Sequence, residues 1–407
     1  MANNTLLAKT RRQGRTCIVL LVLLAFSLGV SEFNVIGIEA ELASDFGVTL
    51  PEVGQFISLF ALTYAVATPV LTLATGRFKR YSLLAAYALV FIAGNLLSAI
   101  ASNFATMLLA RIALGLVSGT LIAVGVTYIP ELVSYKKVPI VISVVYAAYS
   151  MAMVVSTSVG KIMAGTIGWH YVMYSSLALA VIVCAALVVI MPRSGSTDEP
   201  VTAKDQAKLL IEPCIITGSL IFVFGVGSVY VFYGYITPYV QTVLGMNTYE
   251  ASTTLLVYGC ICLISNLLGG VLDSKVGMKA LLVIFPLLGL ALLGLMLAQS
   301  TLMAALFCMA AIAFLMYSFS VSCITLFMRV ADELHPKALT LASSIEPLAF
   351  NIGISFGTAV GGLVVGNLGI QYAGGAGAVF TIVAFAMVVV TLLLSKKALL
   401  NREKNEE

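Results

Sequence analysis

Four ionisable residues of this sequence lie inside long apolar stretches, where charged side chains are rare. They are Glu32, Arg111, Lys161 and Glu346. A charged side chain at the centre of a bilayer costs about 2.5–3.5 kcal/mol on insertion scales, so such residues usually have a partner or a function. A buried carboxylate can bind and release a proton, and a guanidinium or ammonium group can hold an anion. These residue types therefore predict the movement of protons and charged groups rather than covalent chemistry.

Glu32 follows an apolar run from Cys17 to Val30 and lies about two-thirds of the way along a helix that starts there. Polar side chains accompany it at helical spacing, at Ser27, Ser31 and Asn34. One interpretation is a structural carboxylate that these neighbours satisfy. The other is a proton-binding site, with Ser31 and Asn34 beside a substrate.

Arg111 lies about two turns inside another apolar stretch. Because a guanidinium group stays charged, it must reach the membrane interface, water or an anion. Two roles remain open for Arg111. It extends outward to the interface, or it forms a contact that function requires.

Lys161 ends a polar stripe at helical spacing, as if the stripe lined an aqueous wall. The other members of this stripe are Ser143, Tyr146, Ser150 and Thr157. Lys161 either extends to the nearby membrane surface or acts in function, by binding an anionic substrate or by pairing with an acid. We expect Tyr146 and Ser150 to contact substrate in the second case.

Glu346 precedes Pro347, whose ring removes a backbone donor and frees a carbonyl in that turn of the helix. Asn351 belongs to a polar stripe beside it, together with Ser344, Ser355 and Thr358. We expect Glu346 to bind substrate or a second proton and Asn351 to contact substrate. A purely structural role for Glu346 is the alternative.

Tyr230 and Tyr233 share one face of a further apolar stretch. Tyrosine belts at membrane interfaces explain some of the tyrosines in this region. Tyr230 and Tyr233 lie deeper, and their rings can stack on a flat organic substrate.

The elements that must position these residues are membrane-spanning helices. The chain has 407 residues, of which 60% are hydrophobic and only 10% are charged, whereas soluble domains are near 25% charged. With roughly 20 residues per span, we predict an all-α membrane protein with twelve transmembrane helices. They fall near residues 17–38, 52–75, 82–101, 105–130, 138–165, 169–191, 213–239, 249–272, 279–298, 302–328, 338–365 and 371–395.

Basic residues predict the orientation, because they accumulate on the cytoplasmic side. The predicted topology places 20 of the 22 Lys and Arg residues on one side, and the two exceptions are Arg111 and Lys161. We therefore expect both termini in the cytoplasm and a multi-pass protein of the inner membrane.

The hydrophilic stretch 192–212 divides the chain into two similar halves. A short basic turn in the first half, "GRFKRY", has a counterpart in the second, "DSKVGMK". We predict a cytoplasmic N-terminus (1–16), a six-helix bundle (17–191), a cytoplasmic linker (192–212), a second six-helix bundle (213–395) and a cytoplasmic tail (396–407). Two pseudo-symmetric halves are typical of a transporter with a substrate site between repeats.

Other classes of function receive little support. The seven cysteines and two histidines lack the spacing of a metal site, and no nucleophile–base pair points to catalysis, so we expect neither an enzyme nor a catalytic residue. No feature indicates nucleic-acid binding. A membrane-bound sensor or scaffold is a weaker alternative, because no appended domain is evident.

Several segments resemble the major facilitator superfamily, in its twelve-span drug:proton antiporter branch, and most closely the sugar, purine and drug efflux permeases of the arabinose-efflux type. These segments are "SEFNVIGIEAELASDFGV" from Ser31, "GNLLSAIASNFATMLLARIALGLVSG" through Arg111, "YGYITP" from Tyr233, "SNLLGG" and "LASSIEPLAFNIG". The resemblance covers nearly the whole chain. Two departures stand out: Ser158 occupies the place of the usual proline in span 5, and Glu346 that of an asparagine.

The resemblance implies the major facilitator fold and proton-coupled export of a small organic molecule, with no cofactor and a monomeric chain in the lipid bilayer. It puts spans 1 and 4 side by side, so that Glu32 and Arg111 can pair. From the residues themselves we expect Glu32, Arg111 and Glu346 to couple transport to protons, and Glu346, where relatives have an asparagine, is the candidate for a feature peculiar to this protein. The resemblance also makes the turns with Arg77, Arg80, Asp273 and Lys275 a cytoplasmic gate. A symporter or uniporter remains the alternative, because the span 5 motif is altered.

Overall fold

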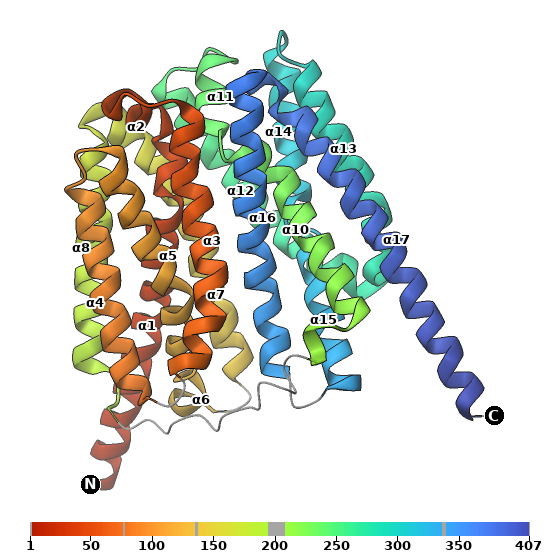
Figure 1. Cartoon of the computed structure of the whole chain (residues 1–407). Helices are drawn as coiled ribbons and strands as arrows, with labels where there is room; N and C mark the ends of the chain where they lie inside the picture. Colours follow the sequence, from red (N-terminus) through yellow and green to blue (C-terminus); the bar gives the residue numbers. More distant parts are fainter. Residues whose placement is uncertain (1, 76–77, 135–136, 194–207, 336–338, 407) are drawn as a thin grey trace. The chain divides into compact units, whose positions relative to one another are not determined.

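The computed structural model describes residues 2–75, 78–134, 137–193, 208–335 and 339–406, and all regular structure in these ranges is helical (Figure 1). Eleven continuous helical stretches of the described chain are long and apolar enough to cross a membrane. The longest, Thr248–Leu297, has 50 residues, which is about 75 Å of helix against a hydrocarbon core of about 30 Å. It contains two helices, which makes twelve candidate crossings within the described ranges, and the predicted all-α membrane fold is confirmed.

The chain divides into two compact units, which we describe separately. Unit 1 comprises Met1–Val48 and Leu62–Pro200, and unit 2 comprises Thr49–Ala61 and Val201–Glu407. The helix α3 (Leu50–Thr75) therefore contributes to both. Its first part belongs with unit 2, where Gly54 lies against the Tyr235 ring and Pro51 lies beside Gly362.

Unit 1 is built from helices that match the first six predicted spans. Besides α3, they are α1 (Ala2–Gly37), α2 (Glu39–Phe46), α4 (Arg80–Ala99), α5 (Phe104–Val126), α6 (Ile129–Leu132), α7 (Val138–Thr166) and α8 (Trp169–Ile190). The short helices α2 and α6 follow α1 and α5 after breaks at the ends of these spans.

Unit 2 contains the last six spans, two of which are broken into shorter helices. They are α10 (Pro213–Tyr233), α11 (Ile236–Thr242), α12 (Thr248–Val276), η2 (Gly277–Ala280), α13 (Leu281–Leu297), α14 (Leu302–Met316), α15 (Ser320–Leu334), α16 (Leu339–Asn367), η4 (Ile370–Tyr372) and α17 (Ala373–Glu406). The seventh span consists of α10 and α11, and the tenth consists of α14 and α15.

Corresponding helices pack together in the two units, as expected for a repeated structure. In unit 1, α1 packs on α5, α7 and α8, while α4 packs on α5 and α8. In unit 2, α10 packs on α14, α15, α16 and α17, while α13 packs on α14 and α17. The first helix of each unit is thus its central element, and its last part is buried throughout, from Ser31 to Gly37 on α1 and from Gly225 to Tyr233 on α10.

Glycines allow the closest of these contacts in unit 1, between α1 and α7. A Cβ atom at Gly29 would lie 2.8 Å from the carbonyl oxygen of Tyr149, and one at Gly37 would lie 2.6 Å from that of Thr157. Small residues of this kind let helix backbones approach closely in membranes. Both glycines flank Glu32, so they fix which residues of α7 lie beside it.

The corresponding contact in unit 2 joins α10 and α16, and here most of the glycines lie on the second helix. Gly353, Gly357 and Gly361 of α16 face the carbonyl oxygens of Val223, Gly227 and Val231 on α10. A Cβ atom at Gly357 would lie 2.5 Å from the Gly227 oxygen. The spacing of four residues on both helices keeps this seam close over two turns.

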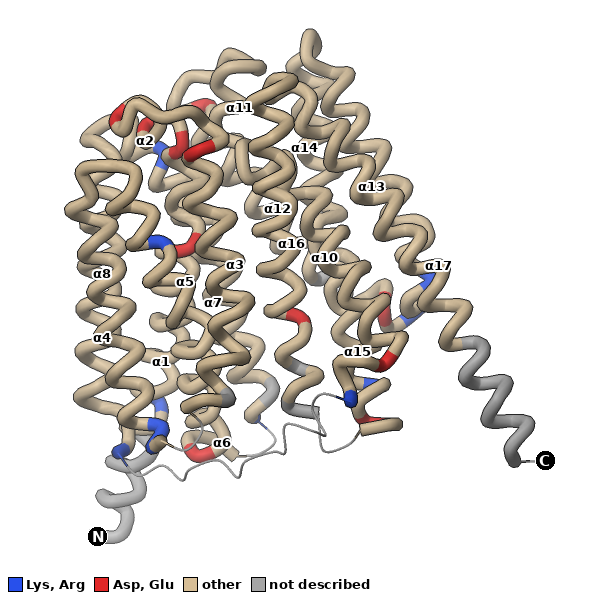
Figure 2. The backbone as a smooth tube through the Cα atoms, in the orientation of Figure 1, with Lys and Arg blue, Asp and Glu red and all other residues tan. Residues whose placement is uncertain are grey.

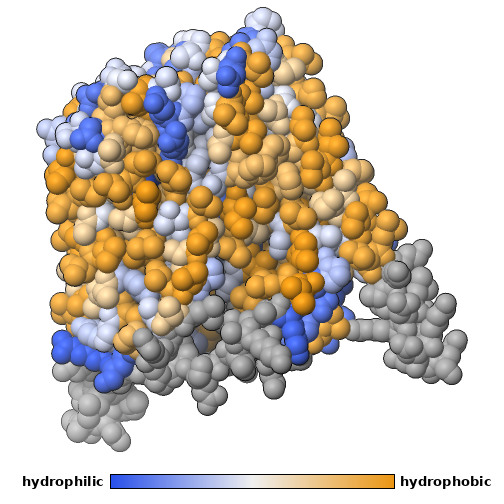
Figure 3. Space-filling view, in the orientation of Figure 1, coloured by the Kyte–Doolittle hydropathy of each residue, from blue (hydrophilic) through white to orange (hydrophobic). Residues whose placement is uncertain are grey.

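Charged residues are concentrated at the ends of the helices of unit 1. Figure 2 shows Asp and Glu gathered around α2, and Lys and Arg at the opposite end, where the N-terminus lies. Apolar side chains cover most of the visible surface between these ends (Figure 3). This distribution is the one that a bilayer requires.

Candidate functional site

Glu32 is buried inside unit 1, with only 5% of its surface exposed. Its carboxylate accepts a hydrogen bond from the hydroxyl of Tyr149 on α7. The close approach at Gly29 and Gly37 brings this tyrosine within reach of α1. The carboxylate of Glu32 therefore has a specific donor on a neighbouring helix.

Arg111 of α5 lies beside Glu32 and is 1% exposed. Its guanidinium donates to two consecutive backbone carbonyls of α1, through Nη1 to Ser31 and through Nη2 to Glu32 at 2.7 Å. The guanidinium is also within electrostatic range of the Glu32 carboxylate. The structure thus brings together the two residues expected to pair, and the guanidinium additionally holds the backbone of α1.

Ser31 and Asn34 make contacts with neighbouring helices of unit 1. The Ser31 hydroxyl donates to the side-chain oxygen of Asn95 on α4 at 2.8 Å. The Asn34 amide donates to Ser176 of α8 at 3.1 Å and contacts the sulfur of Met173 at 3.4 Å. Both side chains thereby join α1 to its neighbours, while the side-chain oxygen of Asn34 is buried without a hydrogen-bond donor among the described residues.

Lys161 is 0% exposed, although it lies near the end of α7. Its ammonium forms an ion pair with Glu41 of α2, with Nζ 2.5 Å from Oε1. Earlier on α7, Tyr146 is exposed, and the Ser150 hydroxyl donates to the Tyr146 carbonyl at 3.3 Å. The expected stripe therefore divides into a buried charged end and an exposed polar part.

In unit 2, Tyr230 and Tyr233 belong to a buried aromatic cluster. The Tyr233 ring stacks on Tyr258 with centroids 5.3 Å apart and meets Tyr230 edge-on at the same separation. Phe350 extends the cluster, because it contacts Tyr230 edge-on and stacks on Tyr317, each at 6.1 Å. These contacts connect helices α10, α12 and α16.

Glu346 is half-buried on α16, four residues before Phe350. Residues at this spacing lie on one face of a helix, so a carboxylate lies one turn from the aromatic cluster. The helix continues through Pro347, whose carbonyl accepts a hydrogen bond from the Asn351 amide at 3.1 Å. Glu346 also lies within electrostatic range of Cys323 on α15.

The residues of the expected cytoplasmic gate have different environments. Arg77 lies outside the described residues. Arg80 forms an ion pair with Glu131 of α6 at 2.9 Å and donates to the Thr127 carbonyl at 3.3 Å. Asp273 accepts a hydrogen bond from Thr325 at 2.8 Å, and Lys275 is exposed.

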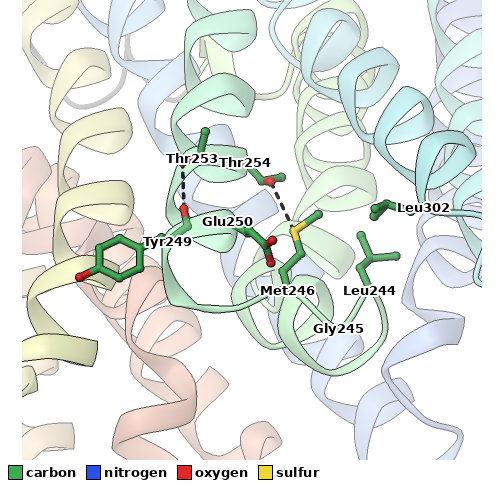
Figure 4. A pocket seen from close by; sticks show the side chains of 8 residues that line it. All are labelled: Leu244, Gly245, Met246, Tyr249, Glu250, Thr253, Thr254 and Leu302. Atoms are coloured by element: carbon green, nitrogen blue, oxygen red, sulfur yellow. Dashed lines mark hydrogen bonds between the residues drawn. The ribbon is translucent and has the colours of Figure 1, made fainter.

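A shallow pocket of about 580 Å³ opens beside the loop between α11 and α12 (Figure 4). It is lined by Leu244, Gly245, Met246, Tyr249, Glu250, Thr253, Thr254 and Leu302. The Glu250 carboxylate already accepts from the backbone N–H of Asn247 at 2.9 Å, in a capping box that starts α12. The only carboxylate of this pocket therefore has a local structural role.

Within the described parts of the chain, no three His, Cys, Asp or Glu side chains are grouped so that they could hold a metal ion. The seven cysteines are free thiols. The ionisable groups described above therefore remain the candidates for function.

Four residues that were not predicted as site residues lie against candidate side chains in the structure: Tyr149, Glu39, Glu41 and Glu131. For Glu41 the sequence holds a signal, since Glu41 follows span 1 and Lys161 lies near the end of span 5, so both lie at the membrane face opposite the N-terminus in the predicted topology. For Tyr149 the flanking glycines indicate a close helix contact, but they do not identify the partner helix. Glu131 supplies a carboxylate for Arg80, because the turn that contains Arg80, "GRFKRY", has no acidic residue.

Comparison with known proteins places these observations in a family. Residues 21–345 match the profile described as Major Facilitator Superfamily. The chain is 26% identical over 377 residues to the "Uncharacterized MFS-type transporter YtbD" of Bacillus subtilis (strain 168), covering 92% of this chain and 94% of that one. It is 28% identical over 373 residues to the "Inner membrane transport protein YdhP" of Escherichia coli (strain K12), covering 89% and 92%.

Two solved structures of transporters are similar to this chain in fold. A bacterial homologue of the human lysosomal transporter Spinster, inward-facing and occupied, superimposes with a TM-score of 0.75 at 16% identity, covering 92% of this chain and 96% of that one. A D-xylose–proton symporter gives a TM-score of 0.69 at 18% identity, with the same coverage. At these identities the likeness concerns the fold alone.

Proposed function

Because this chain belongs to the major facilitator superfamily and is a multi-pass membrane transporter rather than an enzyme, we propose that it exports a small organic molecule in exchange for protons. In this proposal both termini lie in the cytoplasm, the membrane is the inner membrane of a bacterium, and the proton gradient replaces any cofactor. The chain acts as a monomer.

The observation that carries the proposal is the environment of Glu32. A buried carboxylate is stabilised in its charged form by a hydroxyl donor and a nearby guanidinium, and destabilised by burial. Glu32 has the donor in Tyr149, the guanidinium in Arg111 and an almost fully buried side chain. A small movement of α7 or α5 relative to α1 changes this balance and makes Glu32 take up or release a proton.

The test is the Glu32→Gln variant in everted membrane vesicles. A substrate is first identified by growth of deletion and overexpression strains on toxic compounds and metabolites. Glutamine has nearly the same shape but cannot ionise, so the variant should lose pH-driven uphill transport and retain exchange at equal pH. The matched control is Glu250→Gln, where the side chain is exposed and glutamine can preserve the capping box. Full pH-driven transport by Glu32→Gln would refute the proposed role.

The same vesicles decide between antiport and the alternative, symport. An antiporter releases protons from everted vesicles when substrate is added, whereas a symporter takes them in the direction of the substrate. Symport is kept as the alternative because the proline that the resemblance implies for an antiporter is replaced by Ser158. Helix α7 continues through this residue, and its hydroxyl donates to the Val154 carbonyl at 2.8 Å.

For the substrate we propose an organic cation. Glu346 lies one helical turn from Phe350, which stacks on Tyr317, and aromatic faces with a carboxylate attract cations. Lys161 was an expected contact for an anionic substrate, but its ammonium is paired with Glu41. Glu346→Gln should therefore reduce transport of cationic substrates selectively, and Lys161→Gln should not reduce transport of anionic ones selectively. Wild-type rates for Glu346→Gln with every substrate class would make this charge structural.

A further inference from the structure

We propose that Glu39 is a second proton-binding site of this transporter, formed with Glu41 and Lys161 at the end of unit 1 that contains α2. The inference extends the proposed coupling through Glu32 to a second carboxyl group. Its central statement, that Glu39 carries a proton at neutral pH, can be tested without a substrate.

The position of Glu39 is unusual for an acidic side chain. Glu39 is the first residue of α2, directly after the break that ends α1 at Gly37. It is 1% exposed, and both carboxylate oxygens are buried without a hydrogen-bond donor among the residues that the structure describes. A charged carboxylate in such a place is strongly disfavoured, whereas a protonated one loses much less on burial.

The charges around Glu39 lead to the same conclusion. Lys161 and Glu41 form an ion pair with Nζ and Oε1 2.5 Å apart. If Glu39 were also ionised, the buried group would carry two negative charges and one positive charge. One proton on Glu39 makes the group neutral, which a low-dielectric interior favours.

The electrostatics of this group support the assignment to Glu39. Burial raises the pKa of the Glu39 carboxyl well above its ordinary value of 4.5, the Lys161 ammonium partly opposes this, and the Glu41 carboxylate adds to it. Further along α2, Asp45 accepts a hydrogen bond from the Trp169 indole at 3.1 Å, and the Trp169 ring stacks on His170. Of the charged groups near α2, Lys161 is therefore the cation that acts on the Glu39 carboxyl group.

The same lysine makes a proton a better ligand than a metal ion. A metal ion bound to Glu39 and Glu41 would lie beside the ammonium of Lys161, and the two positive charges would repel each other. A proton forms a neutral carboxyl group and needs no further ligands.

The arrangement also provides a way to release the proton. Two carboxylates share one ammonium group, so Lys161 can favour only one of them at a time. When Nζ moves from Glu41 to Glu39, the Glu39 carboxyl gives its proton to water and becomes a paired carboxylate. Glu41, whose side chain is 23% exposed, is then hydrated instead.

The helix that carries Lys161 links this site to Glu32. Tyr149 and Lys161 lie on α7, twelve residues or about 18 Å apart. Movement of α7 along α1 changes the Tyr149–Glu32 contact and the position of Lys161 together. The two carboxyl groups therefore respond to one displacement.

The experiment is isotope-edited infrared spectroscopy of the full-length protein in lipid nanodiscs, with ¹³C-labelled glutamate, titrated from about pH 5 to about pH 9. A protonated carboxyl group has a C=O stretch that a carboxylate lacks. We expect a protonated band at neutral pH that disappears in Glu39→Gln and persists in Glu250→Gln. In Glu41→Gln the Lys161 ammonium is free to pair with Glu39, so the band should titrate at lower pH than in the wild type. In Lys161→Met, loss of the ammonium should shift the titration of this band to higher pH by at least about one unit.

Two results would overturn the inference: wild-type and Glu39→Gln spectra that are identical at every pH, or a Glu39 band that titrates near its ordinary value. Unfolding curves of each variant, followed by the fluorescence of Trp169, show whether the bundle is intact. The outcome is separable from that of the proposed function. Transport that ignores the proton gradient refutes proton coupling and leaves the Glu39 band in place, whereas absence of the band leaves coupling through Glu32 untouched.

Discussion

The contact between Arg111 and the backbone of α1 gives a prediction of measurable size. Two guanidinium nitrogens donate to the carbonyls of the consecutive residues Ser31 and Glu32. Lysine keeps the charge but offers a single nitrogen on a flexible stem, so Arg111→Lys retains at most one of these bonds in good geometry. A hydrogen bond from a charged group contributes about 1.5–3 kcal/mol, and we expect a loss of this size.

The loss converts to a shift in melting temperature. For a domain of about 150–250 residues, each kcal/mol lowers the midpoint by about 2–4 °C, so Arg111→Lys should melt roughly 3–12 °C below the wild type. The protein has a single tryptophan, Trp169, which lies buried in unit 1. Its fluorescence during heating in detergent therefore reports the unfolding of the unit that contains Arg111.

The matched control is Arg193→Lys. Arg193 is exposed, with its guanidinium 5.6 Å from the centre of the Tyr81 ring, and lysine can make the same kind of cation–π contact. This variant should melt within about 1–2 °C of the wild type. If Arg111→Lys melts as the wild type does, the two-carbonyl contact does not stabilise α1, and the reasoning is wrong.

Two further predictions concern the α10–α16 seam and Glu39. Gly357→Ala places a methyl group 2.5 Å from the Gly227 carbonyl oxygen and should lower the free energy of unfolding by about 1–3 kcal/mol. The control Gly270→Ala, which has no atom within 4 Å of its new Cβ, should lower it far less. Equal melting temperatures of the two variants would contradict this prediction. Because folding raises the pKa of Glu39, its contribution to stability is full at pH below its ordinary value of 4.5 and is lost as pH rises toward the folded pKa. Glu39→Gln should therefore gain on the wild type by up to ~1.4 kcal/mol per pH unit in that window, measured by melting temperature against pH. A difference that is the same at every pH would contradict the prediction.

The spans and the fold could be predicted from sequence because hydropathy and length determine them almost alone. Every predicted span has a corresponding helix or pair of helices in the structure. The breaks within spans 7 and 10 were missed. Gly234 and the turn after Met316 interrupt the helix without an apolar-to-polar change that hydropathy would register.

The environment of the ionisable residues could be predicted only in part. The depth of Glu32 and Arg111 in the membrane follows from their place in the apolar stretches. The same place shows that they are exceptional, because charged residues are rare there. The donors and acceptors do not, because they come from distant parts of the chain: Tyr149 is 117 residues from Glu32, and Glu41 is 120 residues from Lys161. Such partners depend on helix rotation and register, which local patterns do not fix.

The two glycine seams bear on the ancestry of the chain. If the halves arose by duplication, the pairing of the first and fifth helices was inherited, yet unit 1 has its seam glycines on the first helix, whereas unit 2 has three on the fifth and one, Gly227, on the first. What the two units share is therefore the narrow separation between two backbones rather than the identity of any position. Residue-by-residue alignment of the halves would miss this kinship, because a loss of side-chain volume on one helix substitutes for a loss on its partner. Enlarging Gly29 would therefore push α1 and α7 apart whatever the size of the side chain that faces it, because the new Cβ atom would lie 2.8 Å from the backbone oxygen of Tyr149.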